Sequence, residues 1–75
     1  MSPTMMRQFW AFIDATRSTI PLALDDRSLV QWLLRQVRSE QSLDRHQQDI
    51  LGDYICQRLA MIRDMAQESQ FAYHA

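Results

Sequence analysis

The chain has few of the residues that make turns. Its 75 residues include one glycine and two prolines. Antiparallel strands need frequent turn residues between them, and no strand-length stretch of this chain alternates apolar and polar side chains. This scarcity excludes a protein built from repeated β-hairpins, and it predicts an all-α fold made of long helices.

Cysteine and histidine are also scarce. Cys56 is the single cysteine, which excludes a disulfide bond within the chain. His46 and His74 lie far apart in the sequence, whereas a zinc site needs a closer set of ligands. One glycine cannot make a glycine-rich phosphate loop. We therefore expect no metal site and no cofactor.

Lysine is absent, and the eight basic residues are all arginines, spread along the chain and interleaved with acids, for a net charge of -1. Such a balance gives no general attraction to nucleic acid or to anionic membranes. No apolar run is long enough to cross a bilayer, and Met1–Met6 lacks the pattern of a signal peptide. The predicted location is the cytoplasm, without membrane contact.

Apolar residues recur at helical spacing in three stretches of one domain that spans residues 1–75. The predicted helices cover residues of about 3–18, 26–39 and 43–68. Residues 69–75 read as a frayed tail. The expected architecture is a small three-helix domain, in which two shorter helices pack on one long C-terminal helix.

Local signals mark the ends of these helices. Ser2 is a good N-cap, and Pro3 suits the first helical position because it has no N–H to leave unsatisfied. Pro21 ends the first helix, since the residue before a proline avoids the helical region. Asp25 is favoured as the cap of the second helix, and Ser42 is predicted to cap the third.

The long helix has one broad apolar face. At 1.5 Å per residue it extends ~40 Å, while the first two helices extend only ~24 Å and ~20 Å. Two arrangements are therefore open: the shorter helices lie end to end along it, or a second copy covers its overhang. The apolar face consists of Ile50, Leu51, Tyr54, Ile55, Leu59, Ile62 and Met65.

Arg58 stands out because a helical projection places it near the centre of that face. A charge there is costly unless it is paired or its tip reaches water. The favoured interpretation is structural: Arg58 snorkels or pairs across a helix joint. The alternative is that it binds a carboxylate of a partner at an interface. The candidate acids within the chain are Asp14, Asp25, Asp26 and Glu40.

Trp32, Phe12 and Met61 lie at the edges of their apolar stripes, and aromatic and methionine side chains are common at protein interfaces. The segment from Tyr54 to Met65 is also where another chain is expected to bind. Gly52 falls beside the apolar face, where it is either tolerated or allows close approach of another helix. Cys56, His46 and His74 are interpreted as inert surface groups. The candidate interface residues are Phe12, Trp32, Tyr54, Arg58, Met61 and Met65.

These patterns predict a protein–protein interaction module, self-associating as a homodimer or bound to a protein partner. Catalysis is not expected, because a three-helix chain of this size rarely forms a concave site with converging groups. The alternative is a small trihelical nucleic-acid-binding regulator, since Ser42–Leu51 opens like a helix of such domains. Asp49, Asp53 and Asp64 on the exposed side make nucleic acid the weaker hypothesis, because they repel phosphates.

Overall fold

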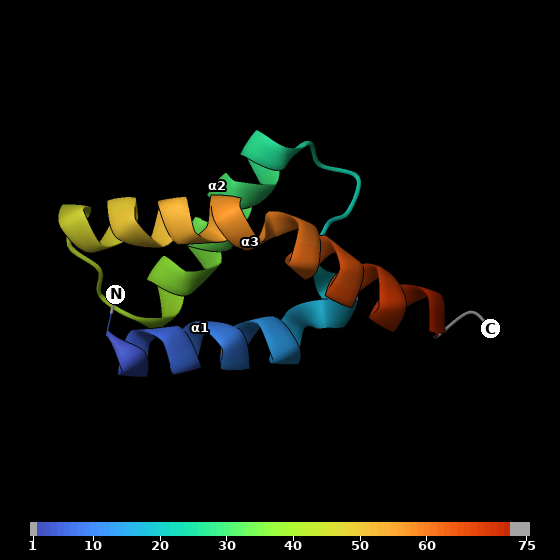
Figure 1. Ribbon diagram of the computed structural model, residues 1–75, viewed down its shortest axis with the longest axis horizontal. Helices are drawn as coiled ribbons and strands as arrows, with labels where there is room; N and C mark the ends of the chain where they lie inside the picture. Colours follow the sequence, from blue (N-terminus) through green and yellow to red (C-terminus); the bar gives the residue numbers. More distant parts are fainter. Residues whose placement is uncertain (1, 73–75) are drawn as a thin grey trace.

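A computed structural model describes residues 2–72 of the chain. Helix α1 spans Pro3–Thr16, a 3-10 turn η1 spans Arg17–Thr19, α2 spans Asp26–Glu40 and α3 spans Arg45–Ala72 (Figure 1). The described residues contain no strand, so the all-α prediction is confirmed, as is the packing of two shorter helices on a long third one.

The start of α1 follows its predicted cap. The Ser2 hydroxyl accepts a hydrogen bond from the backbone N–H of Met5 at 3.1 Å, and Pro3 is the first helical residue. The α-helix ends at Thr16, two residues earlier than predicted, because the chain tightens into η1 before Pro21. Ile20 is extended, with ψ 126°, as expected for a residue that precedes proline.

The cap of α2 is Asp25, as predicted. Its carboxylate accepts a hydrogen bond from the backbone N–H of Ser28 at 2.8 Å. This hydrogen bond lowers the pKa of Asp25, because it stabilises the charged form. The carboxylate also lies at the positive end of the helix dipole.

The start of α3 differs from the prediction. Asp44, not Ser42, caps the helix: its carboxylate accepts from the Gln47 N–H at 2.7 Å. The Gln47 side chain in turn accepts from the Asp44 N–H at 3.0 Å. This reciprocal pair is a capping box, which satisfies two backbone donors at once, whereas Ser42 has no Glu or Gln three residues later. The helix therefore begins at Arg45.

The end of α3 also differs, because residues 69–72 are helical rather than frayed. The Gln70 amide donates hydrogen bonds to the carbonyl oxygens of Arg17 and Ile20, at 3.2 and 2.8 Å. These bonds attach the last turns of α3 to η1 and its connector. The remaining predicted tail, residues 73–75 with His74, lies outside the described residues.

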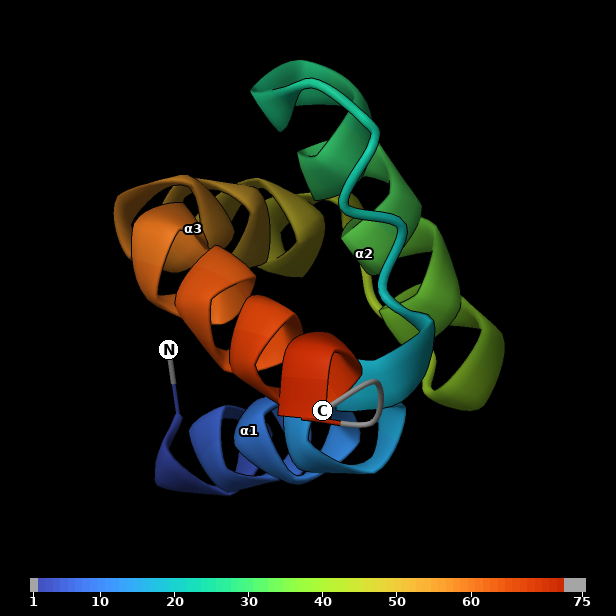
Figure 2. The same ribbon diagram turned by 90° about the vertical axis from the view of Figure 1, so that its right-hand side faces the viewer.

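The helices surround one core. In Figure 1, α1 and α3 both begin at the left, α1 runs below α3, and α2 crosses behind α3. The later half of α3 slants towards η1, which covers its last turns (Figure 1). The end view in Figure 2 shows α2 on one side of α3 and α1 beneath. The two shorter helices therefore do not lie end to end along α3, and the chain itself covers the overhang.

Apolar side chains from every helix and from the connector fill the space between the ribbons. Ile13, Leu29, Leu33, Leu51, Ile55 and Ile62 are fully buried, with Phe9 and Ile20 nearly so. On α3 the buried side chains follow the predicted helical period. They are Leu51, Ile55, Leu59, Ile62 and Ala66.

Gly52 lies where α2 crosses α3. A Cβ atom at this position would be 3.4 Å from Leu34 Cδ1, so the helix that approaches Gly52 belongs to the same chain. The distance is an ordinary van der Waals contact that accepts one methyl group. We expect Gly52→Ala to raise the free energy of unfolding by ~0.5–1 kcal/mol through helix propensity, measured by urea unfolding. A lower value would mean that Leu34 cannot accommodate the methyl group.

Candidate interaction surface

One side of α3, beside its buried face, carries a partly exposed row of mainly apolar side chains. Its members recur at helical spacing, so they lie on one stripe of the helix. Met61 is 53% exposed, Arg58 is exposed, and the others are half-buried. We call this row the α3 strip. It consists of Ile50, Tyr54, Arg58, Met61 and Met65.

Helix α1 holds the tyrosine of the strip in place. Trp10 Nε1 donates a hydrogen bond to the Tyr54 hydroxyl at 2.8 Å. The Phe9 and Trp10 rings meet the Tyr54 ring edge to face, with centroids 6.0 and 6.2 Å away. Tyr54 is thereby a rigid, half-exposed anchor on the strip, of the kind that protein interfaces favour.

Arg58 stacks on this anchor. Its guanidinium carbon lies 5.3 Å from the centre of the Tyr54 ring, a cation–π distance. The predicted position at the centre of the apolar face is wrong. The buried stripe of α3 runs through Ile55 and Leu59, about a quarter of a turn away, and leaves Arg58 on the border, exposed.

Of the two structural interpretations of Arg58, pairing with an acid of the chain is wrong, whereas its exposed tip agrees with snorkelling. Within residues 2–71 the ion pairs are Arg17 with Asp14 at 3.2 Å and Arg63 with Asp26 at 2.9 Å. Arg58 has no carboxylate of that stretch within ion-pair distance. A cation that is already oriented by Tyr54 is therefore available to a group outside the chain.

The arginine that joins helices is Arg63. Its guanidinium donates to the carbonyl oxygens of Leu22 and Leu24, at 3.2 and 2.7 Å, and to Asp26 at 3.1 Å. The side chain is only 22% exposed. One fork of donors thus fastens both the connector and the first turn of α2 to α3.

Met6 of α1 extends the strip. It is 37% exposed, and it lines a shallow hollow of about 330 Å³ together with Ile50, Tyr54, Asp53 and Gln57. The apolar side chains of this hollow come from two helices that the Trp10–Tyr54 hydrogen bond joins. No pattern in the sequence singles out Met6, because helical spacing assigns it to the buried stripe of its helix.

Phe12 and Trp32 do not belong to the strip. Phe12 is 9% exposed and contributes to the core, so its predicted position at the edge of a stripe is wrong. Trp32 projects from α2 and packs half-buried against the core. Because α2 meets α3 on the side of Gly52 and Arg63, Trp32 lies on another part of the molecule.

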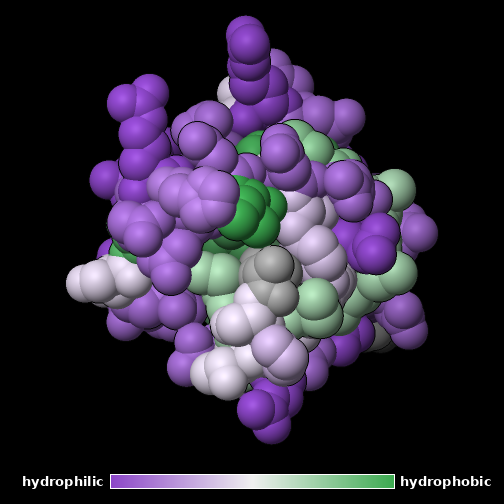
Figure 3. Space-filling model, turned by 60° about the vertical axis from the view of Figure 1, so that its left-hand side comes forward, coloured by the Kyte–Doolittle hydropathy of each residue, from purple (hydrophilic) through white to green (hydrophobic). Residues whose placement is uncertain are grey.

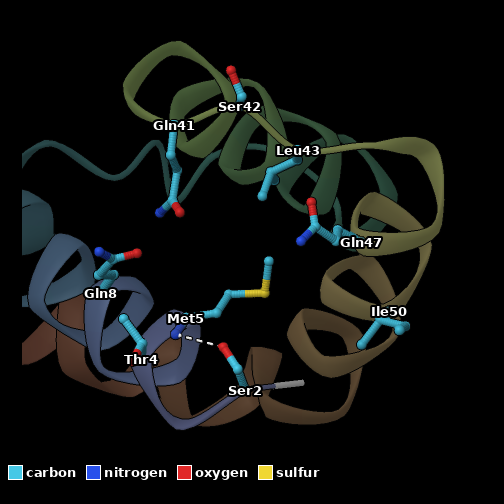
Figure 4. Close-up of a pocket in the computed structure, with 9 residues that line it drawn as sticks. All are labelled: Ser2, Thr4, Met5, Gln8, Gln41, Ser42, Leu43, Gln47 and Ile50. Atoms are coloured by element: carbon cyan, nitrogen blue, oxygen red, sulfur yellow. Dashed lines mark hydrogen bonds between the residues drawn. The ribbon is translucent and has the colours of Figure 1, made fainter.

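A second hollow, of about 370 Å³, opens between the starts of α1 and α3. Figure 3 shows this end of the molecule, where hydrophobic side chains gather amid hydrophilic ones. Met5 points into the hollow, and Gln8 and Gln41 approach it from opposite sides (Figure 4). The lining carries no charge, and Ser2 and Gln47 already cap helices. The hollow therefore results mainly from the way the two helices begin side by side, and we do not assign it as a binding site.

A third hollow, of about 560 Å³, follows the groove between α2 and α3. Its walls include Arg27 and Gln31 on α2, and Cys56 and Gln57 on α3. Cys56 is exposed. His46, also exposed, lies ten residues earlier on the same helix, α3. The structure brings no histidine of residues 2–71 to this thiol in hydrogen-bonding contact.

Metal ligands do not cluster in the described part of the chain. Within residues 2–71, no three His, Cys, Asp or Glu side chains gather closely enough to hold a metal ion. None of the described helices combines the length and the hydrophobicity that crossing a bilayer requires. Comparison of the chain with protein-family models, with curated proteins and with solved structures found no match in any of the three.

Proposed function

We propose that this chain is a small, non-catalytic protein–protein interaction module that binds another protein chain, a partner protein or a second copy of itself, through the α3 strip. The observation that carries the proposal is the exposure of Met61 and Met6 beside the anchored ring of Tyr54. Contiguous apolar side chains that remain in water are a typical feature of interaction sites.

The chemistry of the strip supports this proposal. Methionine side chains are flexible and polarisable, so they adapt to the surface of a partner at low cost. Tyrosine and arginine are among the residue types that most often dominate binding energy. Here Tyr54 is already fixed by Trp10, and Arg58 lies over its ring, so little ordering remains to be done on binding.

A location in the cytoplasm belongs to the same proposal and rests on the lone thiol of Cys56, which a reducing compartment preserves. The nucleic-acid alternative gains no support from the surface of α3. Asp49, Asp53 and Asp64 are exposed along this helix, and their carboxylates would repel phosphates.

Isotope-labelled methionine methyl groups test the proposal by NMR. Spectra of the labelled chain are recorded in buffer over a dilution series and in an extract of the source cells, with signals assigned by single Met→Leu substitutions. We expect the Met6, Met61 and Met65 signals to shift or broaden in at least one of the two conditions. Met5, in the hollow at the helix starts, is the internal control. If the three signals are unchanged in both, the strip is not an interaction surface.

A further inference from the structure

The two edges of the α3 strip carry opposite charges. Asp53, directly before Tyr54, lies on one edge of the strip, and Arg58 lies on the other. Both side chains are exposed, and neither takes part in the ion pairs found within residues 2–71. The strip therefore offers one carboxylate and one guanidinium to whatever covers it.

The spacing of these residues is that of a coiled-coil seam. Ile50, Tyr54 and Met61 are successively four and seven residues apart, which corresponds to one d and two a positions of a heptad repeat, and the exposed Gln57 occupies the d position between Tyr54 and Met61. In that register Asp53 occupies position g and Arg58 occupies position e. In parallel helix pairs, a residue at g and the residue at the following e of the other helix, five positions later, form ion pairs between chains.

We propose that a second copy of this chain covers the strip, with the two α3 helices parallel and Arg58 of each copy paired with Asp53 of the other. This inference rests on the proposed function and names its partner. A two-fold axis parallel to α3 places the positive edge of one strip against the negative edge of the other, twice per dimer. Because the charges of the strip are complementary to those of its own copy, they favour a second copy as the partner over a different protein.

The opposite orientation is unfavourable. In an antiparallel pair, like edges face each other, so the Arg58 edge of one copy meets the Arg58 edge of the other. The parallel seam runs from Ile50 to Met61, ~17 Å, and ends before Asp64, whose carboxylate would face its own copy. Beyond this point α3 slants towards η1 (Figure 1).

Charge reversal tests the pairing. Arg58→Glu and Asp53→Arg are made separately, and association is measured by sedimentation equilibrium for the wild type, for each variant and for an equal mixture. We expect each variant alone to dimerise roughly tenfold or more weakly than the wild type, because like charges then face each other. Circular dichroism confirms that both variants fold.

The equal mixture of the two variants is expected to recover dimers. In a mixed pair, the introduced glutamate of one variant faces the introduced arginine of the other. The native Asp53 of the first variant and the native Arg58 of the second keep their pair. Every ion pair of the wild-type dimer is therefore restored, one of them with its charges exchanged.

A matched control uses Arg35→Glu and Glu40→Arg on α2, which produce the same two net charges at exposed positions away from the strip. Each of these is expected to dimerise alone like the wild type. Variants at 53 and 58 that associate like the wild type, or a mixture that recovers no dimers, would overturn the parallel pairing. A wild type that stays monomeric throughout the dilution series would overturn the second copy as partner. In that case the methyl spectra in cell extract still decide the proposed function separately.

Discussion

Replacing Arg63 with methionine is expected to lower the free energy of unfolding by about 2–3 kcal/mol. Methionine keeps the apolar stem but removes every donor, so the carbonyl oxygens of Leu22 and Leu24 lose their charged hydrogen-bond partner. The ion pair with Asp26 adds little to this sum, because Asp26 is 80% exposed. Urea unfolding followed by circular dichroism measures the change.

The matched control is Arg58→Met, which makes the same chemical change at an exposed position of the same helix. We expect it to change the free energy of unfolding of the single chain, measured at high dilution, by no more than about 0.5 kcal/mol. Arg63→Lys is expected to recover only part of the loss, since an ammonium group lacks the fork that reaches two carbonyls. Equal losses for Arg58→Met and Arg63→Met would show that Arg63 does not fasten the connector.

Replacing Phe9 with alanine is expected to have the largest effect of any single substitution discussed, a loss of about 3–5 kcal/mol. Phe9 is 1% exposed, and its ring meets Trp10 and Tyr54 edge to face. A small domain has only about 5 kcal/mol of stability or slightly more, so much of the chain should be unfolded in water. The helical signal in circular dichroism and its dependence on urea report the result.

Phe71→Ala provides the control for Phe9, because it removes the same side chain from a position that is 66% exposed. Its expected effect is within about 0.5 kcal/mol. A Phe9→Ala variant as stable as Phe71→Ala would mean that the aromatic contacts between α1 and α3 contribute little, and that Tyr54 is not held as described.

The helical period was sufficient to find the core of α3, because Leu51, Ile55, Leu59 and Ile62 follow one another at intervals of three or four residues. It could not assign Arg58 and Arg63. An error of less than a quarter of a turn moves a residue from the centre of an apolar face to its border. The role of Arg63 depends on where the backbone between Pro21 and Leu24 lies, and no local sequence pattern predicts that position.

Other differences had a signal in the sequence. Asp44 is followed three residues later by Gln47, the capping-box spacing that Ser42 lacks. Phe12 appeared to lie beside a single apolar stripe, yet it belongs to the core. The sequence predicted only part of the interaction surface. Tyr54, Arg58, Met61 and Met65 were expected, whereas Met6 joins them only through the packing of α1 on α3.

The most direct test of the strip as a binding surface is the response of the methionine methyl signals to concentration. A strip that self-associates predicts that the signals of Met6, Met61 and Met65 move together as the chain is concentrated, with one common midpoint, while Met5 stays constant. In the Arg58→Glu variant the common midpoint of these three signals should move to a concentration roughly tenfold or more higher. A Met5 signal that moves while the other three are constant would place the contact at the hollow between the starts of α1 and α3 and contradict the strip.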